Sequence, residues 1–501
     1  MTSYSAINGV AHEHGSRPGS ASSSRSGSSR RRGKKEAGTS GQASWISSVI
    51  NLVNTIVGAG VLAMPSALSH MGILLGVLII LWAGLTAGFG LYLQTRCARY
   101  LERGKSSFFA LSQITYPNAA VVFDAAIAIK CFGVGVSYLI IIGDLMPGVV
   151  RGFTDSADGY LLDRHFWVTA FMLIVIPLSF LRRLDSLKYT SVVALISIGY
   201  LVILVVYHFA KGDTMQERGE IRVIKWAGAV PTLASFPVIV FAYTCHQNMF
   251  SILNEINDNS PFRTAAVVTT SIGSSGAIYI LVAITGYLSF GNNVAGNIVG
   301  MYAPSAASTI GKAAIVVLVM FSYPLQVHPC RASVDAVLKW RPSSFRSRSS
   351  SPMRASLLNP AKPSGAKQSP DSMSEVQFAA ITTVIIVLSY VVAMTVSSLE
   401  KVLAYVGSTG STSISFILPG LFYYKISSPS SPHHQRLMKE DDDEEDYDSD
   451  QDSNEERADR WLGGRHWRAM LLRRLSLALA VYGGVVMVVC LVTNTFLIAA
   501  H

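Results

Sequence analysis

Two short segments of the chain place helix-breaking or polar residues inside long apolar runs. The first is GAG at Gly58–Gly60, within WISSVINLVNTIVGAGVLAMPSAL, and the second is YTCHQN at Tyr243–Asn248, which follows Pro231 and Pro237. Glycine weakens a helix interior by about 1 kcal/mol per residue, and buried polar groups need partners or a cavity. Both segments predict interrupted helices, although small residues such as Gly58–Gly60 also serve as close packing sites between helices.

An interrupted helix offers two kinds of backbone group to a ligand. The N–H groups that follow Gly58–Gly60, together with the positive end of the helix dipole, suit a carboxylate. The opened carbonyl groups of Asn54–Ile56 and Phe241–Tyr243 suit an ammonium group. The two breaks therefore predict a site for the α-amino and α-carboxyl groups of an amino acid. The predicted substrate-binding residues are Asn54, Thr55, Ile56, Gly58, Ala59, Gly60, Phe241, Tyr243 and Thr244.

The elements that position these segments are predicted membrane-spanning helices. The chain of 501 residues is 50% hydrophobic and only 14% charged, against about 25% charged residues in soluble domains. Its apolar blocks are long enough to cross a bilayer, which takes roughly 20 residues. Eleven spans are predicted, at 44–68, 73–97, 120–147, 165–181, 187–210, 229–254, 264–290, 307–330, 375–397, 401–424 and 470–499.

The interrupted helices are the first and the sixth of these spans. This spacing is typical of transporters built from two inverted repeats of five helices, in which the broken first helix of each repeat forms the substrate site. The predicted fold class is an all-α polytopic membrane protein. Its eleven transmembrane helices would form a 5+5 inverted repeat plus one extra helix.

Charge between the spans predicts the orientation. The net charge is +10, and basic residues gather in RCARYLERGK after span 2, RRLDSLK after span 4 and the loop after span 8. The positive-inside rule then places the N-terminus in the cytosol and the C-terminus on the lumenal side. Because the basic residues flank spans, we expect no nucleic-acid partner.

The predicted organisation is a disordered basic tail at 1–43, transmembrane helices 1–8 at 44–335, a disordered basic loop at 336–374, helices 9–10 at 375–424, a disordered acidic loop at 425–469 and helix 11 at 470–501.

Three segments of the chain resemble the amino acid/auxin permease family. They are NLVNTIVGAGVLAMP, FAYTCHQNMFSILNEI and FSYPLQVHPCR, and they look most like the fungal vacuolar amino-acid transporters, relatives of the sodium-coupled neutral amino-acid transporters. The resemblance covers about 44–335 and 375–499, and leaves the basic loop after span 8 and the acidic loop after span 10 without a match. It implies a LeuT-like fold of eleven helices and carrier-type amino-acid transport.

The resemblance also suggests residues that couple transport to an ion. In the sodium-coupled relatives, ligands come from an Asn of span 1 and a hydroxyl of span 8, and the matching positions are Asn54 and Ser322. Asn54 could equally cap the broken helix, and Ser322 could bond its own helix backbone. The vacuolar branch is proton-driven, which directs attention to histidine, a side chain that titrates near neutral pH.

Three further residues are candidates for a proton-driven mechanism. His246 lies in the second break, and His328 lies near the end of span 8, where a structural role is favoured. Lys130 lies deep in span 3, where it could supply the positive charge that sodium supplies in the relatives, or pair with Asp124 or Asp144. The predicted ion-coupling residues are Asn54, Lys130, His246, Ser322 and His328.

These features favour a secondary active transporter of amino acids in the vacuolar membrane, coupled to protons and exporting from lumen to cytosol. The alternatives are a plasma-membrane permease, possibly sodium-coupled, and an amino-acid sensor with a transporter fold. No G-x-S-x-G, H-E-x-x-H or phosphate-loop motif is present, so we expect no enzyme and no catalytic residue. We also expect no cofactor and no metal site; the coupling ion is H⁺, with Na⁺ as the alternative. The expected partners are the amino-acid substrate and the lipid bilayer, and no oligomeric state is predicted.

Overall fold

The computed structural model describes residues 43–154, 159–181, 190–339, 373–435 and 455–497. The predicted tail up to residue 42, residues 340–372 of the predicted basic loop and residues 436–454 of the predicted acidic loop lie outside these residues. The described part is helical and contains no strand, apart from one isolated bridge between Ala43 and Ile256.

The two predicted interruptions are present. The first span consists of α1 (Trp45–Ile56) and α2 (Gly60–Met71), which are bent by 56° at the break. The sixth consists of α8 (Ala229–Ala242) and α9 (His246–Glu255). In both cases the helix stops at the residues that the sequence singled out.

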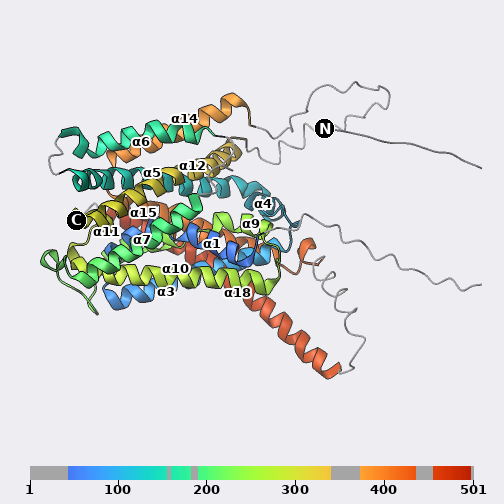
Figure 1. Ribbon diagram of the computed structural model, residues 1–501. Coiled ribbons are helices and arrows are strands. Elements are labelled where there is room, and N and C mark those ends of the chain that lie inside the picture. Colours follow the sequence, from blue (N-terminus) through green and yellow to red (C-terminus); the bar gives the residue numbers. More distant parts are fainter. Residues whose placement is uncertain (1–42, 155–158, 182–189, 340–372, 436–454, 498–501) are drawn as a thin grey trace, which may run out of the picture. The chain divides into compact units, whose positions relative to one another are not determined.

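Long helices surround these broken ones (Figure 1). The remaining helices of the described part are α3 (Ile73–Ala98), α4 (Phe108–Thr115), α5 (Ala120–Phe153), α6 (Arg164–Ser179), α7 (Thr190–Lys211), α10 (Pro261–Phe290), α11 (Ile298–Met301), α12 (Ala306–Lys339), α14 (Glu375–Thr395), α15 (Leu399–Val406), α16 (Leu418–Ile426) and α18 (Glu455–Val492). Serine side chains cap the N-termini of several helices by accepting a backbone N–H. These caps are Ser44, Ser107, Ser260, Ser374 and Ser398.

The packing places α5 and α12 side by side, with α6 and α14 against them on one side and α7 against α12 on the other. α10 packs on α1, α2, α3 and α7. The broken helices thus lie between α10 and the α5–α12 pair. This arrangement encloses both breaks within the protein, where irregular backbone is tolerated at membrane depth.

Eight helices of the described part are long and apolar enough to cross a membrane, and the bent α1–α2 pair raises this number to nine. The two other predicted spans have different forms: α6 has 16 residues, and 399–426 is divided into α15, two π-helical turns and α16. The count of eleven and the 5+5 repeat therefore remain predictions.

Two helices also extend beyond the predicted spans. α12 continues to Lys339 and α18 begins at Glu455, so both enter segments predicted as disordered loops at 336–374 and 425–469. Apolar composition marks only the part of a helix that faces lipid. Charged residues such as Glu, Arg and Lys continue a helix into water, because their helix propensity is high.

Candidate functional site

A cavity of about 390 Å³ lies where the two breaks meet α5 and α12. Its volume is in the range of small-molecule sites, which is about 300–1,000 Å³. Its polar lining residues come from α1, α5, α9, α12 and the break between α8 and α9. The lining residues are Asn51, Asn54, Thr55, Ile56, Val57, Gly58, Ala59, Gly60, Lys130, Val134, Tyr138, Ala194, Ile198, Phe241, Thr244, Gln247, Asn248, Leu318, Val319, Ser322, Leu325, Gln326 and Pro329.

The structure brings most of the sequence-predicted residues together around this cavity. Those that line it are Asn54, Thr55, Ile56, Gly58, Ala59, Gly60, Phe241, Thr244, Lys130 and Ser322. Three of the predicted residues lie elsewhere: Tyr243, His246 and His328. The sequence did not single out the polar lining residues Asn51, Tyr138 and Gln326, and it named Gln247 and Asn248 only as part of the second break.

The three residues outside the cavity have other surroundings. Tyr243 is buried with its ring edge-on to Tyr279. His246 is fully buried and faces α3, where its Nε2 donates to the carbonyl oxygen of Ala87 at 3.1 Å. His328 is exposed on α12. The imidazole of His246 is therefore a packing and hydrogen-bonding partner of α3.

Lys130 enters the cavity from α5 and is only 4% exposed. Asp144, one of the acids considered as its partner, instead pairs with Arg164 of α6, at 3.3 Å between Oδ1 and Nε. In the described part of the chain, Lys130 has no ion-pair partner, and no carboxylate lines the cavity. A buried lysine without a protein counter-ion can pair with an anionic ligand in its ammonium form, or release its proton.

Tyr279 of α10 connects the two breaks, although no sequence pattern pointed to this residue. Its hydroxyl lies 2.6 Å from the carbonyl oxygen of Ile56 and 2.8 Å from that of Ala242. The carbonyl of Ile56, predicted as an open acceptor, is therefore already engaged. A second link joins α1 to α9, because Asn248 Nδ2 donates to Thr55 Oγ1 at 3.0 Å.

The two glycines of the first break have different roles. A Cβ at Gly60 would lie 2.6 Å from the Cβ of Ala242, whereas a Cβ at Gly58 would meet nothing within 4 Å. Gly60 is thus the close packing site between α2 and α8, and Gly58 belongs to the break itself. The motif therefore contains both a helix break, at Gly58, and a close packing site, at Gly60.

This difference gives a matched pair of variants. Gly60→Ala should lower the thermal stability of the purified protein and its uptake, because overpacking of this kind costs about 1–3 kcal/mol. Gly58→Ala should keep the thermal stability of the wild type, because a Cβ at this position would meet no atom within 4 Å. Equal behaviour of the two variants would contradict the assignment.

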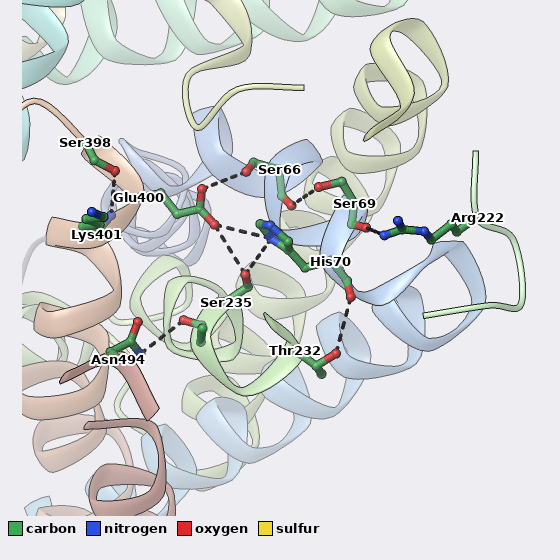
Figure 2. A network of polar contacts seen from close by, with 11 residues as sticks. Ser66, Ser69, His70, Arg222, Thr232, Ser235, Ser398, Glu400, Lys401 and Asn494 are labelled. Carbon is green, nitrogen blue, oxygen red and sulfur yellow. Dashed lines mark hydrogen bonds and ion pairs between the residues drawn. The ribbon is translucent and has the colours of Figure 1, made fainter. Parts of the chain in front are cut away.

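A polar network outside the cavity lining joins α2 and α8 to α15 (Figure 2). Glu400 of α15 accepts from Ser66 of α2 at 2.9 Å and from Ser235 of α8 at 3.4 Å, and lies 3.5 Å from His70 Nδ1. Ser235 and His70 are themselves 2.8 Å apart. We call Ser66, His70, Ser235 and Glu400 the closing network. On the side of α1 and α9, the cavity lining continues to Asn51, Asn248 and Pro329.

The fold and the cavity define a membrane transporter whose central cavity lies at two helix breaks. A family model described as "Transmembrane amino acid transporter protein" matches residues 41–441. The chain belongs to this family, and the resemblance seen in the sequence is confirmed. The family and the names of the relatives are those of transporters rather than enzymes.

Two curated fungal relatives match over most of their length. Vacuolar amino acid transporter 5 of Schizosaccharomyces pombe is 43% identical over 461 residues, covering 91% of this chain and 95% of the relative. Vacuolar amino acid transporter 6 of Saccharomyces cerevisiae is 41% identical over 406 residues, covering 77% and 90%. Among solved structures, MhsT in complex with L-phenylalanine aligns with a TM-score of 0.54 at 12% identity, covering 91% of this chain and 100% of that one. At this identity the likeness shows the LeuT-like fold alone.

Proposed function

We propose that this protein is a secondary active carrier that exports amino acids from the vacuolar lumen to the cytosol, coupled to protons. The observation that supports this most directly is the cavity, which both helix breaks line and which contains the buried Lys130. The names of the fungal relatives support amino acids as cargo and the vacuole as location.

The backbone groups at the first break would hold the constant part of the substrate. The N–H groups at the start of α2, next to Ala59 and Gly60, would bind the α-carboxylate. The last carbonyls of a helix lack partners within that helix. In α1, the carbonyl of Val53 accepts from Val57 and that of Ile56 accepts from Tyr279. The carbonyls of Asn54 and Thr55 are then the acceptors for the α-ammonium group.

Lys130 would couple this binding to the proton. Its ammonium form supplies a positive charge to the cavity, and its loss of a proton would remove that charge when the substrate leaves. Sodium remains the alternative, since Asn54 Oδ1 is buried without a partner in the described part of the chain. Ser322, in contrast, donates its hydroxyl to the Leu318 carbonyl of its own helix at 2.8 Å. Both positions line the cavity.

Uptake by membrane vesicles tests the coupling. Lys130→Ala should reduce pH-gradient-driven uptake by about tenfold or more, because the switchable charge is lost, while counterflow at equal pH persists. His246→Ala should impair the same uptake through the contact of its ring with α3 while the protein still inserts. A sodium gradient alone should not drive uptake. Normal pH-gradient-driven uptake by Lys130→Ala, with unchanged pH dependence, would refute proton coupling through Lys130.

The proposed membrane topology of the protein has eleven spans, with the N-terminus in the cytosol and the C-terminus in the lumen. It counts α6 and the interrupted segment 399–426 as the two spans beyond the nine described above. Reporter tags at the two termini of the protein in intact vacuoles should be protease-sensitive at the N-terminus only. Sensitivity of both tags would contradict the odd number of spans.

A further inference from the structure

A second hollow, separate from the central cavity, lies between α16 and α18. This groove has a volume of about 810 Å³ and is lined by Tyr424, Met470, Arg473, Arg474, Leu477, Ala478, Val481 and Tyr482. None of these residues belongs to the central cavity. Two of them are cationic and none is acidic.

The groove lies at the start of a lipid-facing stretch. No charged residue occurs between Leu475 and Phe496, so Arg473 and Arg474 are the last charges before the uncharged part of the span. From Arg474 to Tyr482 the helix rises about 12 Å at 1.5 Å per residue. Half of a hydrocarbon core is about 15 Å thick. The groove therefore runs from headgroup depth almost to the midplane, over one leaflet.

The charged end of the groove is held in place by α16. Arg473 Nε donates to the carbonyl oxygen of Tyr424 at 3.2 Å, and its guanidinium carbon lies 4.6 Å from the centre of the Tyr424 ring. The hydrogen bond to Tyr424 uses the Nε–H group of Arg473 and not its two outer nitrogens. Arg474 is exposed and has no acidic partner in the described part of the chain. Arginine pairs of this kind bind phosphate groups well, because guanidinium matches phosphate geometry.

The other end of the groove is apolar. Leu477 and Val481 are 37% and 59% exposed, as expected for side chains that contact lipid. Tyr482 closes this end, where its hydroxyl accepts from Trp82 Nε1 of α3 at 3.0 Å. A groove with one charged end and one apolar end fits an amphipathic molecule, with its phosphate at the arginines and its hydrocarbon chain along the apolar side chains.

We propose that this groove binds one anionic phospholipid, with its phosphate and acidic headgroup at Arg473 and Arg474 and one acyl chain along Leu477 and Val481. The other candidate occupant is the acidic run DDDEEDYDSD at 441–450 of the chain, which lies outside the described residues. That run matches the arginines in charge. It cannot fill the apolar part of the groove, so the lipid is favoured.

Native mass spectrometry of the full-length protein in detergent, titrated with phosphatidylserine, tests the proposal. Arg473→Gln or Arg474→Gln should weaken binding about fivefold, and the double variant tenfold or more, on the scale of one basic residue at an anionic surface. Val481→Trp fills the apolar end and should weaken binding while both arginines remain. Arg468→Gln is the control, because Arg468 is exposed on the same helix but does not line the groove.

The other arms separate the possible occupants. Phosphatidylcholine should bind more weakly than phosphatidylserine, and soluble glycerophosphoserine should not compete. Unchanged binding in all groove variants would overturn the proposal. If the arginine variants lost phosphatidylserine binding but Val481→Trp kept it, the proposal would also be overturned, since the groove would then hold only a headgroup or the acidic run. Neutralising the acids of 441–450 should leave lipid binding intact or strengthen it; loss of binding would contradict the lipid assignment. None of these readouts depends on transport.

Discussion

Replacing Tyr279 by phenylalanine should reduce amino-acid uptake by about tenfold or more, although the protein still reaches the membrane. The change removes one oxygen atom, and with it the donor shared by the carbonyls of Ile56 and Ala242. A buried polar group left without its partner costs about 1–3 kcal/mol. Because these carbonyls end α1 and α8, the loss would loosen both breaks together. The measurement is the initial uptake rate in proteoliposomes, normalised to reconstituted protein.

The matched control is Tyr207→Phe, which removes the hydroxyl of a half-exposed tyrosine on α7 that does not line the cavity. It should transport at the wild-type rate. Tyr279→Phe should also lower the thermal stability of the detergent-purified protein, whereas Tyr207→Phe should not. Wild-type uptake and stability in Tyr279→Phe would show that the tyrosine does not hold the breaks.

The breaks could be predicted from the sequence because they arise from local chemistry. Glycines at 58 and 60 and the polar run after Phe241 disfavour a continuous helix wherever they occur. The residues next to a break then line whatever cavity it opens. This is why most of the predicted residues, from Asn54 to Gly60, surround one cavity in the structure.

The direction of side chains within a helix was harder to predict. His246 lies at the second break, as expected, but its ring points to Ala87, a residue 159 positions earlier in the chain. Tyr279 looks like an ordinary aromatic residue of an apolar span, and only the packing of α10 against both breaks gives it a role. Depth follows from the sequence, whereas the face that a residue presents depends on which helices pack together.

The same limit applies to the closing network. Glu400 lies between two predicted spans, at 375–397 and 401–424, where an acidic residue is unremarkable. Its hydrogen-bond partner Ser66 is 334 positions away, and Ser235 is 165 positions away. Only the fold brings α15 against α2 and α8, the two halves that follow and precede the breaks. Glu400 thereby joins both broken helices (Figure 2).

Glu400→Ala should release α2 and α8 from α15 and reduce uptake by about tenfold or more. It removes the acceptor for Ser66 and Ser235 and the carboxylate beside His70. Hydrogen bonds to a charged group are worth about 1.5–3 kcal/mol, and the partial exposure of Glu400 places the effect toward the lower end. A loss of about 1.4 kcal/mol shifts an equilibrium tenfold. An alternating-access carrier that no longer closes on this side would cycle slowly.

Two further variants separate the carboxylate from the position. Lys401→Ala changes the next residue, which is exposed and has no side chain in the closing network; it should transport normally. Glu400→Gln keeps two polar atoms but loses the charge, so its uptake should lie between those of Glu400→Ala and wild type. Uptake and thermal stability should fall in the same order, because one set of contacts controls both. If Glu400→Ala lost uptake but kept wild-type stability, the carboxylate would act on the substrate or the proton, and the closing role would be refuted.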